Sequence, residues 1–485
     1  MDRLQELPSA RVWKLFQIIS SIPRASGNET AVSKWIAEYA AKSGAQCIAD
    51  QTGNLIITAR ATPGHENAPS ICFQAHMDMV AVQDPGHNHN FSTDPISLVL
   101  KETDGELYMH ADHTTLGADD GIGVALALAF ITDHDSQHGP LEAVFTVGEE
   151  TSMVGMRELR DNLLRSKMMI NIDSERDDEV IIGAAGGADA TFTLKTGTER
   201  TETEASLKLE FSGFTGGHSG IEIHYGRANA IKVAAETAKR LIEGFGLSLI
   251  SVDGGLFHNA IPTAATVILG GSESGINKAE AEAGRILDEL KKKYSDTDPN
   301  ISLIMTRDKG SAALNFKDSK DVVSVICGIP DGVISMNDQF EDTVDSSSNL
   351  GIISTEKDRI TAVALLRSLS STDPLRDMMR KAVCHSPAEV EFSKDYTCWT
   401  PSSYSPLLKM YERIYEESNF RKPRVTALHA GVECGILMEK YPDMDIISIG
   451  PNILGAHTTG EKLSVQSVEK IYGLLSELLE EVSEL

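Results

Sequence analysis

Two adjacent glutamates follow an apolar run in AVFTVGEETSMVG, residues 143–155. Paired carboxylates repel each other and lose solvation when they are buried. Glu149 and Glu150 therefore lie either in a solvated loop after a strand or beside a positive charge. In the second case one glutamate binds a metal ion while the other stays free to move protons, which is the chemistry of metal-assisted hydrolysis.

Four further segments place ligand-type side chains after apolar runs. The first is FQAHMDMV, where His76 and Asp78 are two residues apart and share one face of a strand. Asp78 is therefore placed to hold one imidazole nitrogen of His76 while the other nitrogen binds a metal. A hydrogen-bonded His–Asp pair near a strand end is the structural alternative.

The other three segments are LGADDGIG with Asp119, NIDSE with Asp173, and GAHTTGE with His457. Each has an ordinary explanation when taken alone, namely a helix cap, a turn acid and a loop histidine. Jointly, five acids or histidines at successive strand ends are expected to converge on one edge of a sheet. Two zinc ions bridged by a shared carboxylate need about that set of ligands.

The elements that must position these residues alternate between strand and helix up to about residue 185. Periodicity predicts helices over 29–44 and 121–134, and strands over 54–61, 70–78, 141–148 and 166–174. Short apolar strands that alternate with helices predict an α/β fold with a mainly parallel, buried sheet. Functional loops in such folds lie beyond the carboxyl ends of the strands.

Between about residues 186 and 400 the pattern of apolar and polar residues changes. Half-exposed strands and amphipathic helices over 229–245 and 278–294 predict a second, α+β domain. A comparable succession recurs from 322 to 394, which is a weak sign of internal duplication. After residue 400 the alternation of apolar strands and helices returns. We infer that a first domain, 1–185 and 401–485, is interrupted by an inserted domain, 186–400.

Composition narrows the class of protein. A chain of 485 residues exceeds what one core usually supports, and its net charge of −27 argues against a nucleic-acid or anionic-membrane partner. No apolar run approaches the roughly 20 residues that cross a bilayer. The first residues lack a signal-like apolar stretch, and the six scattered cysteines fit reduced thiols, so we expect a cytoplasmic protein.

The motifs HMD, LGADDGIG, GEET, NIDSE and GAHTTGE, in this order and spacing, resemble those of the dinuclear zinc peptidases of the aminoacylase and carboxypeptidase superfamily. Within it, GGHSGIEIH, NAIP and HAGVECGIL resemble the bacterial aminoacyl-histidine (Xaa-His) dipeptidases, over essentially the whole chain. The resemblance implies a mainly parallel-sheet zinc-peptidase catalytic domain interrupted by a large α+β lid domain. It implies that His76 and Asp173 hold one metal, that Glu150 and His457 hold the other, and that Asp119 bridges both.

The same resemblance implies that Asp78 orients His76 and that Glu149 is the general base, taking a proton from the metal-bridging water. The cofactors are then two divalent metal ions. Histidine and carboxylate ligands without thiolate suit Zn, and Mn or Co would also fit.

The inserted domain supplies the candidates for substrate contacts. His218 in FTGGHSG matches a lid histidine that contacts substrate near the metals, in many relatives from the partner subunit. Asn259 in HNAIPTAA matches a substrate-contacting asparagine. Relatives often read NAIPRE there, so Thr263 replaces an arginine and leaves the carboxylate clamp open, with Arg367 in LLRSLSS as a substitute. Glu433 in HAGVECG is a candidate for selecting the substrate's amino terminus, with an ordinary loop acid as the alternative.

These inferences predict a cytosolic metallodipeptidase that acts on small peptides, in particular Xaa-His dipeptides such as carnosine (β-alanyl-histidine). A related N-acyl-amino-acid deacylase or an aminotripeptidase is the alternative on the same site. A non-catalytic descendant is expected to have lost Glu149 or a ligand, and none is lost. The exact dipeptide, the native metal, the choice between monomer and a homodimer through the lid, and the subunit from which His218 acts stay open.

Overall fold

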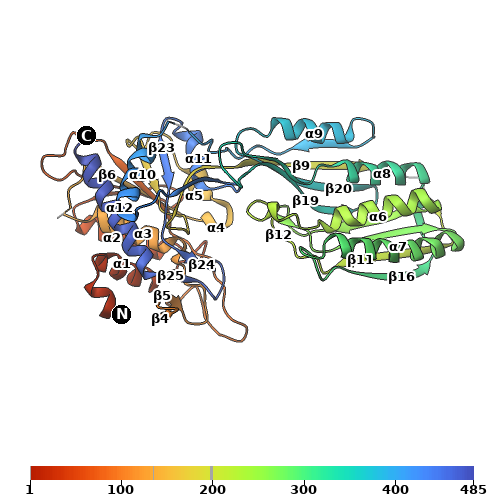
Figure 1. Ribbon diagram of the computed structural model, residues 1–485, viewed down its shortest axis with the longest axis horizontal. Coiled ribbons are helices and arrows are strands. Elements are labelled where there is room, and N and C mark those ends of the chain that lie inside the picture. Colours follow the sequence, from red (N-terminus) through yellow and green to blue (C-terminus); the bar gives the residue numbers. More distant parts are fainter. Residues whose placement is uncertain (1, 135, 197–199, 403) are drawn as a thin grey trace. The chain divides into compact units, whose positions relative to one another are not determined.

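The computed structural model describes residues 2–134, 136–196, 200–402 and 404–485 (Figure 1). The chain forms two compact units. Unit 1 comprises Met1–Gly183, Pro401–Ala427 and Val432–Leu485, and unit 2 comprises Ala184–Thr400 and Leu428–Gly431. The first boundary thus falls after residue 183 rather than 185, and a four-residue segment from the C-terminal part joins unit 2, which the sequence did not suggest.

Unit 1 is built on an eight-stranded sheet. Its strand order is β1 (Gln46–Ala49), β2 (Leu55–Ala59), β6 (Leu141–Thr146), β3 (Ile71–His76), β7 (Met168–Asn171), β23 (Asp445–Ser448), β8 (Glu179–Ala184) and β22 (Arg424–Leu428). The central strands β6, β3, β7 and β23 are parallel, and antiparallel pairs flank them. The predicted α/β class with a mainly parallel sheet is therefore confirmed. A separate small sheet joins β24 (Ile453–Leu454), β25 (Lys462–Ser464), β5 (Glu106–Ala111) and β4 (Leu98–Thr103).

Helix α3 (Ala118–Ile131) shows why this unit forms a buried sheet. After Asp119 and Asp120 its residues are apolar on every side, and they are buried in contact with α1 (Ala10–Ser20) and strand β3. Strands β3 and β6 are likewise buried along their whole length. Further helices of this unit are α2 (Thr30–Lys42), α4 (Glu149–Ser152), α5 (Val154–Glu158), α10 (Pro406–Asn419), α11 (Glu433–Lys440) and α12 (Val465–Ser483).

Unit 2 contains a nine-stranded antiparallel sheet. Its order is β16 (Ser302–Lys309), β11 (Ala205–Ser212), β15 (Ala265–Gly271), β13 (Ser248–Gly254), β19 (Val344–Thr355), β20 (Arg359–Ser368), β9 (Gly186–Lys195) and β21 (Glu389–Phe392), with β18 (Gly332–Met336) beside β19. Strand β11 alternates buried and half-buried residues, as expected for a sheet with one covered face. The large α+β insertion is therefore present as predicted.

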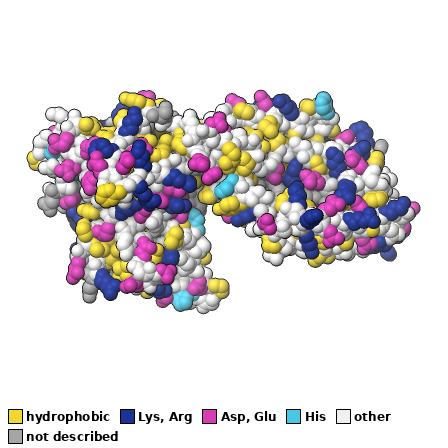
Figure 2. All heavy atoms as spheres, in the orientation of Figure 1, with side chains coloured by type: hydrophobic (Ala, Val, Ile, Leu, Met, Phe, Trp, Pro, Cys, Tyr) yellow, Lys and Arg dark blue, Asp and Glu magenta, His cyan; other side chains and the backbone are white. Residues whose placement is uncertain are grey.

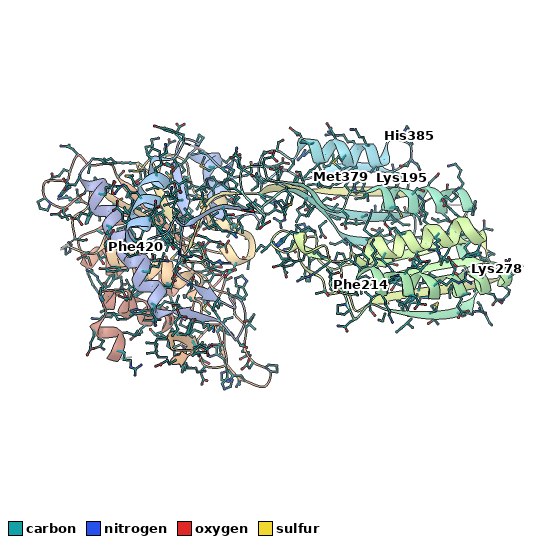
Figure 3. The ribbon with its side chains drawn as sticks, in the orientation of Figure 1. Lys195, Phe214, Lys278, Met379, His385 and Phe420 are labelled. Atoms are coloured by element: carbon teal, nitrogen blue, oxygen red, sulfur yellow. The ribbon has the colours of Figure 1, made fainter. Side chains whose placement is uncertain are left out.

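Helices α6 (Ala230–Phe245), α7 (Glu273–Lys293) and α8 (Phe316–Gly328) pack against strands of this sheet (Figure 1). Met379 of α9 (Asp373–Val383) and Phe214, both labelled in Figure 3, belong to the same apolar core. The sequence pattern suggests that residues 322–394 repeat the order of elements that begins at about residue 186. The two stretches start differently, since 322–330 lies largely in α8 whereas the first stretch starts with strand β9. The Asn315 side chain accepts from the N–H of Asp318 and starts this helix.

All six cysteines are free thiols, in agreement with the reading of the sequence. Among the described residues, the helices are too short or too polar to span a bilayer. On the face shown in Figure 2, acidic and basic side chains are interspersed with apolar ones over both units.

Candidate metal centre

His76 lies at the carboxyl end of strand β3, and its side chain is 1% exposed. Its Nε2 is 3.0 Å from Oδ1 of Asp119 and 3.5 Å from Oδ1 of Asp173. Although burial alone would lower the pKa of His76, the hydrogen bonds to these aspartates raise it well above the usual value. The His76 ring therefore lies in a cluster of carboxylates that favours a positive charge at this point.

Asp119 divides its two carboxylate oxygens between two histidines. While Oδ1 faces His76, Oδ2 is 3.1 Å from Nε2 of His457, in the loop before β25. The same Nε2 is 3.0 Å from Oε1 of Glu150. Two half-sites with Asp119 between them thus come from the ends of different elements, one with His76 and Asp173 and the other with His457 and Glu150.

Asp78 lies beneath these groups and is fully buried. Its Oδ1 is 3.5 Å from Nδ1 of His76, as expected for a residue that orients the ring. Burial would raise the pKa of Asp78, but the hydrogen bonds from His76 and Ser26 lower it to about 2. Asp78 is therefore an anion beside Nδ1 of His76, and Nε2 of that ring faces Asp119 and Asp173.

Glu149 and Glu150 form the first turn of α4 after Gly148, which has a φ of +63°. Oε2 of Glu149 lies 3.9 Å from Nε2 of His76, and its side chain is 15% exposed. Burial, followed by the neighbouring carboxylates, raises the pKa of Glu149 well above its usual value. A carboxyl group with a raised pKa at the edge of a charged cluster suits proton transfer.

The residues present fit two divalent cations. Ligand atoms of His76, Asp119 and Glu150 lie within 4.8 Å of one another, without thiolates among them. Oε1 of Glu150 is buried without a hydrogen bond of good geometry. Burial, followed by repulsion from the other acids, raises the pKa of Asp173 to about 6. Divalent cations would reverse this repulsion and satisfy the unpaired oxygen.

Asp120 belongs to this region although the sequence analysis did not select it. Its ligand atoms lie within 4.8 Å of those of His76 and Asp173. However, its Oδ2 accepts from the N–H of His76 at 3.1 Å and its Oδ1 from the N–H of Gly123 at 3.1 Å. Because both oxygens are occupied by backbone donors, we interpret Asp120 as a support for His76 rather than as a ligand.

Glu433 lies in unit 1 at the start of α11 and is 1% exposed. Its Oε2 accepts from Nε2 of Gln74 at 2.6 Å and from Oγ1 of Thr146 at 2.7 Å. Burial raises the pKa of Glu433 to about 8. These bonds connect one oxygen of Glu433 to strands β3 and β6, whereas its Oε1 has no partner among the described residues. Contact with the substrate's amino terminus stays a prediction.

His218, Asn259 and Arg367 belong to unit 2. His218, in the short strand β12 (Gly217–His218), accepts at Nδ1 from the N–H groups of Gly220 and Ile221, at 3.2 and 3.0 Å. Burial, followed by the charge of Arg367, lowers the pKa of His218 to about 4. The ring is therefore neutral, and its proton is on Nε2, which can donate a hydrogen bond.

Arg367 is a buried cation of strand β20 and is 5% exposed. Its Nη1 donates to the hydroxyl of Tyr396 at 2.8 Å, and its Nε has no partner among the described residues. A Cβ atom added to Gly220 would approach both Cε1 of His218 and Nε of Arg367, so these two side chains are neighbours. The carbonyl of Asn259 accepts from the N–H of Ser219, beside His218.

Asp119 thus lies between two histidine–carboxylate pairs at the sheet edge, an arrangement expected of a dinuclear metallohydrolase centre. The sequence model of "Peptidase family M20/M25/M40" matches residues 72–481. The chain belongs to this metallopeptidase family.

Comparison with individual proteins agrees with this assignment. The chain is 34% identical over 488 residues to the "cytosol non-specific dipeptidase" of Escherichia coli (strain K12), covering 99% of both chains. It matches the crystal structure of an aminoacylhistidine dipeptidase from Vibrio alginolyticus with a TM-score of 0.86 and 32% identity, covering 99% of this chain and 98% of that one. A tripeptidase from Staphylococcus aureus matches over 99% of this chain and 100% of its own, at a TM-score of 0.56 and 16% identity, and shares the fold alone.

Proposed function

We propose that this metallopeptidase hydrolyses unblocked dipeptides, with Xaa-His dipeptides such as carnosine as its preferred substrates. The observation that carries the proposal is the pair of half-sites that share Asp119, with Glu149 3.9 Å from His76. The similarity to two dipeptidases over nearly the whole chain supports the substrate class.

The residues of the chain divide the reaction between them. His76 and Asp173 would hold one cation, His457 and Glu150 the other, and Asp119 both. When bound, two such cations polarise the scissile carbonyl and lower the pKa of water. Zn is the first choice for this donor set, and Mn or Co also fits.

Glu149 then acts as the general base. It removes a proton from the attacking water, whose oxygen forms a bond to the carbonyl carbon. It later returns the proton to the amine nitrogen as the C–N bond breaks. Asp78 keeps His76 oriented throughout. Nε2–H of His218 is the donor that we assign to the oxyanion, because that ring is neutral and its Nδ1 is already an acceptor.

Arg367 is the group that we assign to the substrate's carboxylate. Among the described residues it forms no ion pair, and a buried guanidinium without an anion is unfavourable. Asn259 is proposed to contact the substrate near this group. Support comes from the position of its backbone beside His218.

A substrate panel tests the proposal. Carnosine, other Xaa-His dipeptides, a tripeptide and N-acetylated amino acids are compared, with and without chelator, for wild type and Glu149→Ala. We expect fast, chelator-sensitive turnover of free dipeptides only. Chelator-resistant turnover would exclude the metal mechanism, and equal rates for N-acetyl amino acids or tripeptides would favour a deacylase or an aminotripeptidase. Carnosine amide is the control for Arg367, since it lacks the carboxylate and is expected to raise KM in wild type but not in Arg367→Met.

We also propose a cytoplasmic location and a homodimer through unit 2. The free thiols and the name of the E. coli relative support the location. Strands β16 and β21 are the edges of the main sheet of unit 2, and such edges permit pairing with a second copy. Sedimentation analysis of the full chain tests the dimer, and a monomer at micromolar concentration would exclude it.

A further inference from the structure

A buried carboxylate outside the ligand set holds the turn that carries Asp119. Glu461 is 2% exposed, and its Oε2 accepts from the N–H groups of Leu116 and Gly117 at 2.7 and 2.9 Å. Its Oε1 accepts from Ala118 at 2.7 Å and from Asp119 at 3.4 Å. One side chain thus satisfies four successive backbone donors up to the bridging aspartate.

A buried arginine holds the same turn from its carbonyl side. Arg24 is 1% exposed and donates through Nη1 to the carbonyls of Met77 and Asp78, at 3.0 and 2.8 Å. Its Nη2 donates to the carbonyl of Gly117. Gly117 has a φ of +65°, and a Cβ atom there would lie 2.6 Å from that nitrogen, so any other residue would be strained and would crowd the arginine. Arg24 therefore connects the loop of Asp78 to the turn of Asp119.

Arg24 and Glu461 are also electrostatic partners. Burial lowers the pKa of Arg24, and the charge of Glu461 is the largest influence that opposes this effect. Opposite charges on the two sides of one turn compensate each other in an interior where either charge alone would be costly.

The two histidine ligands depend on this pair to different extents. His76 is 1% exposed and is fixed by strand β3, whereas His457 is 51% exposed and lies in a loop with a φ of +63°. Glu461 follows His457 by four residues and closes this loop through a hydrogen bond from its N–H to the carbonyl of Thr458. The Glu461 side chain is therefore the link that holds the loop of His457 against the turn of Asp119.

We propose that Glu461 and Arg24 are positioning residues that set the distance between the two half-sites, and that Glu461 specifically maintains the half-site of His457 and Glu150. The inference rests on the metal assignment above and concerns residues that touch neither the reacting atoms nor the cations. A carboxamide at position 461 could accept only at its oxygen, and its NH2 group would face the backbone donors that the second carboxylate oxygen now satisfies.

Zinc titration of metal-free protein against a competing chromophoric chelator tests the proposal without reference to activity. For wild type we expect two Zn per chain. For Glu461→Gln we expect one site with unchanged affinity and one weakened by about 10–100-fold, the range found when groups that orient metal ligands are removed. Glu142→Gln is the matched control, because Glu142 is also a buried carboxylate of unit 1 that accepts from backbone N–H groups, those of Arg165 and Ser166.

The possible results distinguish a failure of the metal assignment from a failure of the positioning role. Fewer than two Zn on wild type would refute the metal assignment. Two Zn on wild type with two unchanged sites in Glu461→Gln, or equal weakening of both sites, would overturn the positioning role. If Glu461→Gln does not fold, Arg24→Lys decides. This variant keeps the positive charge but loses the two donor nitrogens of the guanidinium, so we expect a smaller loss of zinc affinity, confined to one site. Two sites with unchanged affinity would overturn the proposal.

Discussion

The backbone N–H of Glu149 donates to Oδ1 of Asp78 at 3.0 Å. The N–H of Glu150 donates to the other oxygen of the same carboxylate at 3.2 Å. Asp78 therefore connects two segments of the centre, since it orients His76 and also fixes the turn that carries both glutamates.

Asp78→Asn is expected to reduce kcat by about 10–100-fold, because the amide offers one acceptor oxygen where the carboxylate offers two and no longer holds the Nδ1 side of the His76 ring. Steady-state kinetics at saturating Zn measure the effect. Glu142→Gln is the control, since the Glu142 carboxylate also accepts from two backbone N–H groups of unit 1, those of Arg165 and Ser166. Equal losses in both variants would mean that Asp78 has only a structural role.

Glu149→Ala is expected to lower kcat by about 10²–10⁴-fold while both metals remain bound, because it removes the proton acceptor and no ligand. Metal analysis of the purified variant beside its kinetics separates the two effects. Loss of a metal together with activity would contradict the assignment of Glu149 as base.

Glu150→Ala, in contrast, is expected to weaken one metal site. Glu150 is adjacent to Glu149 in sequence, yet its oxygen lies 3.0 Å from the ligand nitrogen of His457. Chelator competition is expected to show one weakened site, and excess Zn should restore part of the activity. Restoration of Glu149→Ala by the same treatment would show that the two roles are reversed.

Removal of the metals is expected to lower the melting temperature of unit 1. A ligand that binds only the folded state at about 1,000 times its Kd stabilises it by about 4 kcal/mol. Calorimetry with and without chelator measures this change. Asp119→Asn is expected to show a smaller difference, since the bridging oxygens are altered, and an unchanged melting temperature for wild type would argue against resident metals.

Unit 2 is expected to lose stability as the pH falls. Nε2 of His429 forms a hydrogen bond of 2.7 Å with Oγ of Ser347. Burial, followed by the charge of Arg367, lowers the pKa of His429 to about 3. The pKa of His218 is lowered to about 4 for the same reasons. Since both folded-state values lie below the ordinary value of about 6.5, the stabilisation is present above pH 6.5 and is lost as the unfolded chain binds protons at lower pH.

Each of these histidines adds a slope of about 1.4 kcal/mol per pH unit over that window. Urea unfolding between pH 7 and pH 4 measures the slope for wild type and for His429→Gln, which is expected to have a shallower one. His385, an exposed residue labelled in Figure 3, is the control position. An identical slope for wild type and His429→Gln would contradict the shift.

Features encoded by neighbouring residues could be predicted from the sequence. His76 and Asp78 share a strand end, and an apolar run before GEE identifies the turn of Glu149. Contacts between distant segments could not be predicted in this way. Arg24 lies in a loop, and its side chain bonds to carbonyls of residues 77, 78 and 117. Glu461 lies within the motif GAHTTGE, but its side chain accepts from N–H groups of residues 116–119.

Adjacent residues of the same type set a second limit. Asp119 and Asp120 are equivalent in sequence, but one faces two histidines and the other accepts from backbone N–H groups. The segment 322–330 shows the same kind of limit. Its apolar composition does not reveal that it forms part of α8 and packs against the sheet of unit 2.

The order of strands in unit 1 has a consequence for synthesis on the ribosome. Strand β23 lies between β7 and β8, although it follows β7 by more than half of the chain. Residues 184–400 of unit 2 emerge before it as one continuous stretch. A nascent chain that ends before residue 445 therefore exposes the open, apolar edge of β7, which is a site for aggregation or for binding by a chaperone.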